Sequence, residues 1–220
     1  MRSRCAAAVI VSLLLVPFAC TTGAIQPTPG ANGFDLDGEL VGWRAASTGG
    51  RGPDATWHAQ PDGTAVSATR VLSLTNSNHA SEDRFNLFWS AAPRFQDGKL
   101  AVAVRADGGA VDQGGGPIWR VQDANNYYVC RFNPLESNYR VYVVTDGVRR
   151  QLGTALVEAK MGQWHRVEVE HRGDRITCWL DGQRLLEVTD ATIGKEGGVG
   201  VWTKADARTS FDDFYVDPAK

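Results

Sequence analysis

The stretch Trp164–Gly182, WHRVEVEHRGDRITCWLDG, decides the fold, because it predicts two antiparallel strands joined by a tight turn. Apolar and charged residues alternate on both sides of Gly173-Asp174, a dipeptide that supplies the positive φ angle a tight hairpin needs. The pairs that this turn directs into the interior are Val167–Leu180, Val169–Cys178 and His171–Ile176. A register shifted by one residue would bury Glu168 and Glu170, so the pattern determines the pairing.

The rest of the chain keeps the same two-residue alternation and has no long helical period. Turn dipeptides interrupt the alternation at Asp62-Gly63, Asp97-Gly98, Asp107-Gly108, Asp146-Gly147 and Asp181-Gly182. Many short strands separated in this way are typical of folds in which two sheets face each other. The sequence therefore predicts an all-β, two-sheet antiparallel jelly-roll sandwich.

A second stretch, Gly114–Tyr142 or GGGPIWRVQDANNYYVCRFNPLESNYRVY, predicts three consecutive strands. A four-residue loop at 123–126 predicts the pairs Gln122–Tyr127 and Arg120–Val129, and a turn at 134–137 predicts Asn133–Asn138 and Arg131–Arg140. The face directed to the core then carries Trp119, Val121, Tyr128, Cys130, Phe132, Tyr139, Val141 and Val143. The opposite face carries Arg120, Gln122, Tyr127, Arg131, Asn133, Asn138, Arg140 and Tyr142.

On this polar face the sequence predicts that Arg120, Arg131 and Arg140 converge. Like charges that face each other across an antiparallel pair destabilise it, so Arg131 beside Arg140 needs compensation. Protein carboxylates, aromatic faces or an oxygen-rich ligand would provide it. The aromatic candidates are Tyr127, Tyr142 and Trp202. The alternative is a solvated polar face with the arginines spread into water.

The first residues predict export. Arg2 and Arg4 precede an apolar run that ends in small residues, the pattern of a secretory signal peptide. We expect residues 1–24 to be this peptide, with cleavage after Ala24; in the alternative, Cys20 becomes a lipid-anchored amino terminus. Residues 25–33 then form a linker, and residues 34–217 form a single domain in the periplasm or outside the cell.

The charge balance of the chain excludes some partners. The formal net charge is −2, and it becomes −4 when Arg2 and Arg4 are removed with the signal peptide. This mildly acidic balance lacks the excess of positive charge that is typical of proteins that bind nucleic acid or an anionic membrane. We also expect no transmembrane span after the signal peptide.

Two cysteines, Cys130 and Cys178, lie in the predicted domain. Both occupy core-facing positions on strands that we expect in opposite sheets. Export to an oxidising compartment favours a disulfide between them. Two separate buried thiols are the alternative.

Three blocks of the sequence resemble a known family. They are Gly114–Tyr142, GQWHRVEVEHRGDRITCWLDGQRLLEVTD and GGVGVWTKADARTSFDDFYV. Together they are similar to the concanavalin A-like jelly-roll domains called 3-keto-disaccharide hydrolase domains, which are also described as laminin-G-like or glucanase-like. The resemblance covers roughly residues 34–217 and implies two curved antiparallel sheets, with a concave face that often handles carbohydrate.

The resemblance also implies where a ligand would bind. The concave face should hold the three arginines, with Trp202 and Lys204 from a neighbouring strand. Gly198 and Gly200 share that side, so open backbone beside Trp202 would let a flat ligand approach; a tryptophan packed under a loop is the alternative. Many members annotated with hydrolase activity carry Asn-Ser-Gly where this chain has Gly114-Gly115-Gly116-Pro117, which weakens any transfer of that activity.

The search for catalytic carboxylates gives few candidates. Retaining laminarinase-type glycosidases carry Glu-x-Asp-x-(x)-Glu on one strand, and this chain has no such run. Asp206 and Asp213 are the candidates that would reach the arginines, either as counter-ions or as an acid/base pair. Asp35, Asp37 and Asp212 are the candidate ligands of a structural Ca²⁺ ion, without the spacing of an EF-hand. No other cofactor is expected.

The sequence thus predicts an exported domain that binds carbohydrate, or a related oxygen-rich ligand, on its concave face. The expected binding residues are Arg120, Gln122, Tyr127, Arg131, Asn133, Asn138, Arg140, Tyr142, Trp202 and Lys204. Arginines would donate directional hydrogen bonds to hydroxyls or carboxylates, and the aromatic residues would supply flat surface. The alternatives are a hydrolase of 3-keto-glycosides and a structural or partner-binding module of the cell envelope.

Overall fold

The computed structural model describes residues 24–35, 40–67, 69–77 and 81–219, and within them the chain forms fourteen β-strands. The strands are β1 Trp43–Thr48, β2 Thr56–Pro61, β3 Arg70–Asn76, β4 Phe85–Phe95, β5 Gly98–Gly108, β6 Gly116–Asp123, β7 Asn126–Asn133, β8 Asn138–Thr145, β9 Val148–Leu156, β10 Trp164–Arg172, β11 Arg175–Leu180, β12 Gln183–Thr189, β13 Gly197–Lys204 and β14 Arg208–Pro218. No helix long and apolar enough for a membrane span occurs in these described ranges.

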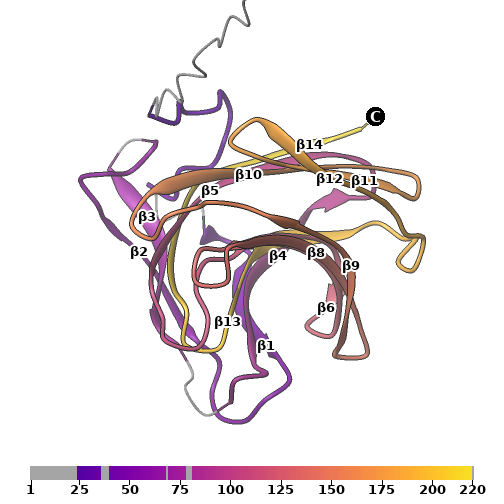
Figure 1. Cartoon of the computed structure of the whole chain (residues 1–220), viewed down its shortest axis with the longest axis horizontal. Coiled ribbons are helices and arrows are strands. Elements are labelled where there is room, and N and C mark those ends of the chain that lie inside the picture. The colour runs from indigo at the N-terminus through magenta and orange to yellow at the C-terminus, as the bar shows by residue number, and fades with distance from the viewer. Residues whose placement is uncertain (1–23, 36–39, 68, 78–80, 220) are drawn as a thin grey trace, which may run out of the picture.

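The strands form two seven-stranded sheets that pack face to face. The first sheet has the order β1-β4-β13-β6-β7-β8-β9, and the second has the order β12-β11-β10-β5-β14-β3-β2. All the pairings between neighbouring strands are antiparallel. Figure 1 shows the first sheet curling strongly, so that its convex side meets the second sheet and its other side is concave. This is the predicted jelly-roll sandwich.

The hairpin of β10 and β11 has the predicted register. Val167 pairs with Leu180, Val169 with Cys178 and His171 with Ile176, and all of these residues are buried. Glu168 and Glu170 alternate with them and remain partly exposed. The hairpin therefore confirms that the two-residue alternation fixes which side of the second sheet is buried.

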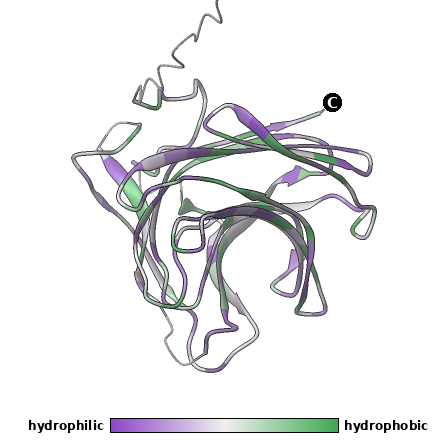
Figure 2. Ribbon diagram, viewed as in Figure 1, coloured by the Kyte–Doolittle hydropathy of each residue, from purple (hydrophilic) through white to green (hydrophobic). Residues whose placement is uncertain are grey.

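The core lies between the sheets and consists of one continuous apolar cluster. Figure 2 shows hydrophobic segments on the strands of both sheets, interrupted by hydrophilic ones. The largest members that the first sheet contributes to this cluster include Trp119, Tyr128 and Phe132, and each of these is fully buried. Burying a side chain of this kind stabilises a fold by about 1.5–3 kcal/mol. The core face predicted for β7 and β8 is confirmed, because all of its residues belong to this cluster.

The pairing of β6 with β7 differs from the prediction. The turn has two residues rather than four, since Asp123 pairs with Asn126, and Trp119 pairs with Tyr128. A β-bulge lies between these pairs, and Arg120 within it has φ +47°. The predicted pairs Gln122–Tyr127 and Arg120–Val129 are therefore wrong, because the extra residues of a bulge rotate the side chains that follow it.

The bulge also moves Val121 to the opposite side of the sheet. A second buried cluster lies on the concave face of the first sheet, and Val121 belongs to it. Its other buried members are Phe85, Leu87, Trp89, Ile118, Tyr127, Val129, Tyr142, Val144 and Trp202. The prediction that Val121 faces the core is therefore wrong. The cluster also makes the base of the concave face largely apolar.

The turn between β7 and β8 follows the prediction. Asn133 pairs with Asn138, and Arg131 pairs with Arg140. The two arginines therefore face each other across an antiparallel pair, as expected.

Cys130 in β7 and Cys178 in β11 lie in opposite sheets, as predicted. In the structure both are buried free thiols of the same core cluster. Burial raises the pKa of the Cys178 thiol, and the neighbouring Cys130 acts in the same direction. The arrangement corresponds to the alternative of two buried thiols.

The segment before the first strand contacts β14. The backbone of Asn32 forms two hydrogen bonds with that of Phe214, and the amide of Thr28 donates to Asp213. Both residues fall in the range that the sequence assigns to a linker, so at these two points that range is attached to the sandwich.

His171 connects the two sheets inside the core. The indole nitrogen of Trp119 in β6 donates to its Nδ1 atom at 2.9 Å, and the imidazole ring is fully buried. Burial lowers the pKa of His171 to about 4, and the positive charge of Arg120 acts in the same direction. The folded protein therefore holds this histidine in its neutral form.

We expect acid to destabilise the fold through His171. The unfolded histidine takes up a proton near its ordinary pKa of 6.5, whereas the folded one does so only near about 4. The contribution of His171 to the free energy of unfolding is therefore fully present above that ordinary pKa. It decreases as the pH falls, by about 2 kcal/mol between pH 7 and about pH 5. Urea unfolding at both pH values would measure the change. His171→Gln should flatten the dependence, and an equally steep dependence in this variant would contradict the assignment.

Candidate functional site

Glu136 lies between two arginines at the end of the concave face. Its Oε2 atom is 3.2 Å from a guanidinium nitrogen of Arg131 and 3.2 Å from one of Arg140. The turn that carries it is fixed by Asn133, whose side-chain oxygen accepts hydrogen bonds from the amides of Leu135 and Glu136. The compensation predicted for the facing arginines is thus provided by a protein carboxylate.

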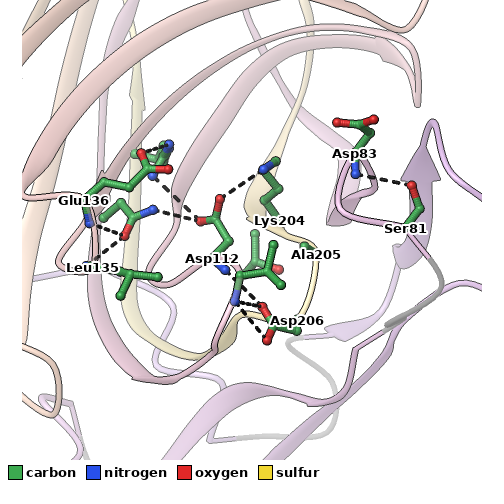
Figure 3. A network of polar contacts seen from close by, with 12 residues as sticks. Ser81, Asp83, Asp112, Leu135, Glu136, Lys204, Ala205 and Asp206 are labelled. Carbon is green, nitrogen blue, oxygen red and sulfur yellow. Dashed lines mark hydrogen bonds and ion pairs between the residues drawn. The ribbon is translucent and has the colours of Figure 1, made fainter.

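Asp112 extends this arrangement on the other side of Arg131. Its Oδ1 atom is 3.8 Å from Nη1 of Arg131, and its Oδ2 atom is 3.4 Å from the ammonium nitrogen of Lys204. Figure 3 shows the Asp112 carboxylate directed toward Lys204, with Glu136 on the far side of the network. The charges alternate in sign along Lys204, Asp112, Arg131, Glu136 and Arg140, and we call these five residues the charged row.

The charged row is buried in its middle and accessible at its ends. The side chains of Arg131 and Asp112 are each 1% exposed, whereas Glu136 is 39% and Arg140 31% exposed. Burial raises the pKa of Asp112 despite the nearby cations. The pKa of Glu136 is lowered: burial opposes this shift, but the hydrogen bond from Asn138 and the attraction of Arg131 outweigh it.

Several buried polar atoms beside the charged row have no hydrogen-bond partner among the described residues. They are Nε of Arg131, Oδ1 of Asn138, the hydroxyl of Tyr142 and Nη1 of Arg149, whereas Oδ2 of Asp112 and Nη1 of Arg131 are held only by ion pairs, with Lys204 and with Asp112. Buried polar groups are almost always paired, because an unpaired one costs about 1–3 kcal/mol. Protein covers these atoms, so they mark a polar region beneath the accessible ends of the charged row.

Asp206 and Asp213 do not pair with the arginines of the charged row. The Asp206 carboxylate accepts hydrogen bonds from the amides of Ala110, Val111 and Asp112, and Figure 3 shows it at the base of that loop. These bonds lower its pKa, although burial opposes the shift. Asp206 therefore positions Asp112. Asp213 is buried in β14 of the second sheet, where it pairs with Arg166.

Arg120 is separated from the charged row by the bulge. Its side chain is 1% exposed and donates to the carbonyl oxygens of Gln96, Ile193 and Gly173, as well as to Asp97. The prediction that three arginines converge is therefore wrong for Arg120, whereas Arg131 and Arg140 do meet. Gln122 likewise bonds backbone carbonyls, of Arg120 and Glu196.

The aromatic residues predicted to contact a ligand are packed instead. Tyr127 and Trp202 are fully buried and hydrogen-bonded to each other, and Tyr142 is 3% exposed. The guanidinium of Arg149 lies over Tyr142 at 4.4 Å and over Phe85 at 4.9 Å from the ring centroids. Trp202 is therefore the packed tryptophan of the alternative interpretation, and its ring offers no open platform.

Gly198 and Gly200 do not leave backbone open for a ligand. A Cβ atom on Gly198 would lie 2.3 Å from the carbonyl oxygen of Ser90 and 2.8 Å from the ring of Trp89. One on Gly200 would lie 2.5 Å from Cβ of Trp89. The glycines thus allow β4 to pack closely against β13. The expectation that they leave open backbone beside Trp202 for a flat ligand is therefore wrong.

The residues proposed for calcium accept hydrogen bonds from protein groups. Asp35 accepts from the amides of Thr69 and Arg70, and Asp212 accepts from the amide and hydroxyl of Ser67. Asp37 lies outside the described residues. In the part of the chain that the structure describes, no group of three or more His, Cys, Asp or Glu side chains could hold a metal ion.

Three residues of the site were missed by the sequence reasoning. Glu136 was assigned only to a turn, and Asp112 and Arg149 lie in segments to which no role was given. The signal for Glu136 was available, because a carboxylate in the turn that joins two facing arginines is the nearest source of compensation. Asp112 depends on the path of a loop, which alternation does not predict.

The comparisons with known proteins agree with this architecture. The family model for the 3-keto-alpha-glucoside-1,2-lyase-like domain matches residues 27–217. The chain therefore belongs to this family of concanavalin A-like jelly-roll domains. No curated protein sequence matches the chain.

Several solved structures share the fold at low sequence identity. The carbohydrate binding module CBM66 from Bacillus subtilis is 16% identical with a TM-score of 0.63, over 79% of this chain and 93% of that module. A Bacillus subtilis protein of unknown function with a galectin-like fold is 13% identical with a TM-score of 0.57, over 84% and 93%. The Bacillus licheniformis beta-glucanase is 11% identical with a TM-score of 0.54, over 81% and 92%.

Arg120 and Arg140 should differ in their effect on stability. Arg120→Ala leaves buried carbonyl oxygens without a donor, so we expect the free energy of unfolding to decrease by about 3 kcal/mol. Arg140→Ala removes a partly exposed ion pair and should cost less than about 1 kcal/mol. Urea unfolding of both variants would measure this. Equal losses would contradict the separation of Arg120 from the charged row.

Proposed function

We propose that the chain is an exported domain that binds a carbohydrate, or a related oxygen-rich ligand, at the charged row on its concave face. The observation that carries this proposal is the row itself, whose ends at Glu136 and Arg140 are accessible. Alternating carboxylates and cations suit sugar hydroxyls, each of which both donates and accepts hydrogen bonds. The family match and the fold shared with a carbohydrate binding module support the same function.

Within this proposal the ends of the charged row contact the ligand. Glu136, Arg140 and Lys204 retain exposed surface, so their free hydrogen-bonding capacity faces the ligand. Arg131 and Asp112 lie beneath them and hold them in place. This arrangement replaces the aromatic platform expected from the sequence, and it makes Arg131→Ala a poor test of binding, because removing that buried cation would also destabilise the fold.

Export remains part of the proposal. The alternative lipid anchor at Cys20 and all but the last residue of the predicted signal peptide, residues 1–24, lie outside the described part of the chain.

Glu136→Gln should weaken carbohydrate binding without unfolding the protein. The variant keeps the shape of the side chain but loses the charge-assisted hydrogen bonds, which are worth about 1.5–3 kcal/mol, so we expect about a tenfold loss of affinity. A glycan array followed by calorimetry on the best ligand would measure it. Glu187→Gln, an exposed glutamate on β12 of the second sheet, is the matched control.

Unchanged affinity in Glu136→Gln would remove the charged row from the binding site. A wild-type protein that binds no glycan but captures a protein of the cell envelope would instead favour the structural or partner-binding alternative.

A second candidate function is an enzyme acting on 3-keto-glycosides, and Asp112 is the observation that favours it. Its pKa is raised by burial, and it lies between two cations. In a 3-keto-glycoside the carbonyl group acidifies the hydrogen on C2, so a base can remove that proton. The resulting enolate expels the substituent on C1, which leaves with a proton, and a 1,2-unsaturated ketone remains. The neighbouring cations would stabilise the enolate oxygen.

For this chemistry Asp112 is the base. Asp112→Asn should therefore lower turnover of a 3-keto-α-glucoside by at least about a hundredfold, the usual contribution of a general base. Mass spectrometry of the unsaturated product, with and without chelator, would follow the reaction. Asp174→Asn, in the distant β10–β11 turn, is the matched control. Because Asp112 is 1% exposed and is a counter-ion of buried Arg131, urea unfolding has to show that Asp112→Asn is folded under the assay conditions. A wild-type protein without turnover would rule out the enzyme, and turnover retained in Asp112→Asn would rule out this base.

A further inference from the structure

The concave face carries more positive than negative charge. The cations on it are Arg44, Arg131, Arg140, Arg149 and Lys204, and the carboxylates are Asp112 and Glu136. Both carboxylates already serve two cations of the charged row. The excess is notable because the whole chain has a net charge of −2.

Arg149 is the cation of this face that is least compensated. Its guanidinium lies over Tyr142 and Phe85 and within 5.9 Å of the Trp202 centroid. It forms no ion pair with any described residue, and its Nη1 atom is buried without a hydrogen-bond partner. Burial lowers the pKa of Arg149, and the charge of nearby Arg131 acts in the same direction, whereas Tyr142 and the more distant Asp112 carboxylate partly oppose the shift.

Arg44 repeats this arrangement on β1. Its guanidinium stacks on Trp89 at 3.9 Å from the ring centroid, and Trp89 belongs to the same buried cluster as Trp202. Two guanidinium groups thus lie over aromatic rings at the base of the concave face. Stacked guanidinium groups keep their edge N–H donors available for a planar anion such as a carboxylate.

A neutral sugar would satisfy hydrogen bonds here but would leave the positive charge uncompensated. A ligand that covers the face removes water from the cations, and that desolvation is unfavourable unless an opposite charge arrives with it. A ligand carboxylate provides both the charge and the two acceptor atoms that a guanidinium edge fits.

We propose that the ligand of the concave face is an acidic glycan, and that Arg149 binds the carboxylate of a uronic acid residue. This inference rests on the proposed carbohydrate binding and adds the class of sugar. The ligand carboxylate would be the counter-ion that Arg149 does not have, while Glu136 and Asp112 remain paired within the charged row.

The test compares oligosaccharides that differ only in their charge. Galacturonate, glucuronate and mannuronate oligomers are titrated into the full chain by calorimetry, each beside its carboxyl-reduced neutral counterpart. We expect at least one acidic oligomer to bind about tenfold more tightly than its neutral counterpart at low salt, with an advantage that shrinks as salt is added. Arg149→Gln should remove this advantage, so that each acidic oligomer and its neutral counterpart bind the variant with equal affinity. Arg175→Gln, an exposed arginine on β11, is the control.

The outcomes separate the two proposals. Equal affinity for each acidic and neutral pair would overturn the acidic glycan and leave carbohydrate binding intact. A sulfated oligosaccharide is titrated beside these pairs, and binding of it alone would overturn the carboxylate assignment. An absence of binding to every acidic and neutral oligosaccharide would overturn both proposals.

Discussion

The Glu136 carboxylate holds together two guanidinium groups that would otherwise repel each other across β7 and β8. The pairing of Arg131 with Arg140 follows from the register of this hairpin, and the register follows from the apolar side chains on its core face. A shift by one residue would bury the charges between the sheets. The repulsion therefore has to be compensated locally, and the β7–β8 turn does so because Asn133 fixes the backbone that carries Glu136.

The same alternation explains which parts of the fold could be predicted from the sequence. In the β10–β11 and β7–β8 hairpins, every second residue is apolar and the turn is short, so both the pairing and the buried side follow directly. The prediction from alternation failed in β6, because the bulge at Arg120 adds residues to one strand only. A bulge leaves little trace in the pattern, because Val121 and Arg120 still alternate in sequence while their sides are exchanged in the structure.

The site was less predictable than the fold, because its geometry depends on loops and on side chains that pack across strands. Arg131 and Arg140 came from strand register and were placed correctly. Trp202 was placed on the correct face, but the approach of the Arg149 guanidinium from β9 to within 5.9 Å of its ring centroid depends on the curl of the sheet. Asp112 reaches Arg131 only because Asp206 holds its loop through three backbone amides. Neither contact has a local signature in the sequence.

The buried part of the charged row is better explained by function than by stability. Moving charged groups out of water is costly, and replacing a buried ion pair by apolar side chains of similar volume is often neutral or stabilising. Arg131 and Asp112 are each 1% exposed, and both leave buried atoms without hydrogen bonds. The aromatic cluster beside them shows that this face accommodates apolar packing. A sandwich selected for stability alone would extend that cluster across the row. Under the proposed function, a polar ligand at the accessible ends of the row is the reason that the buried charges are retained.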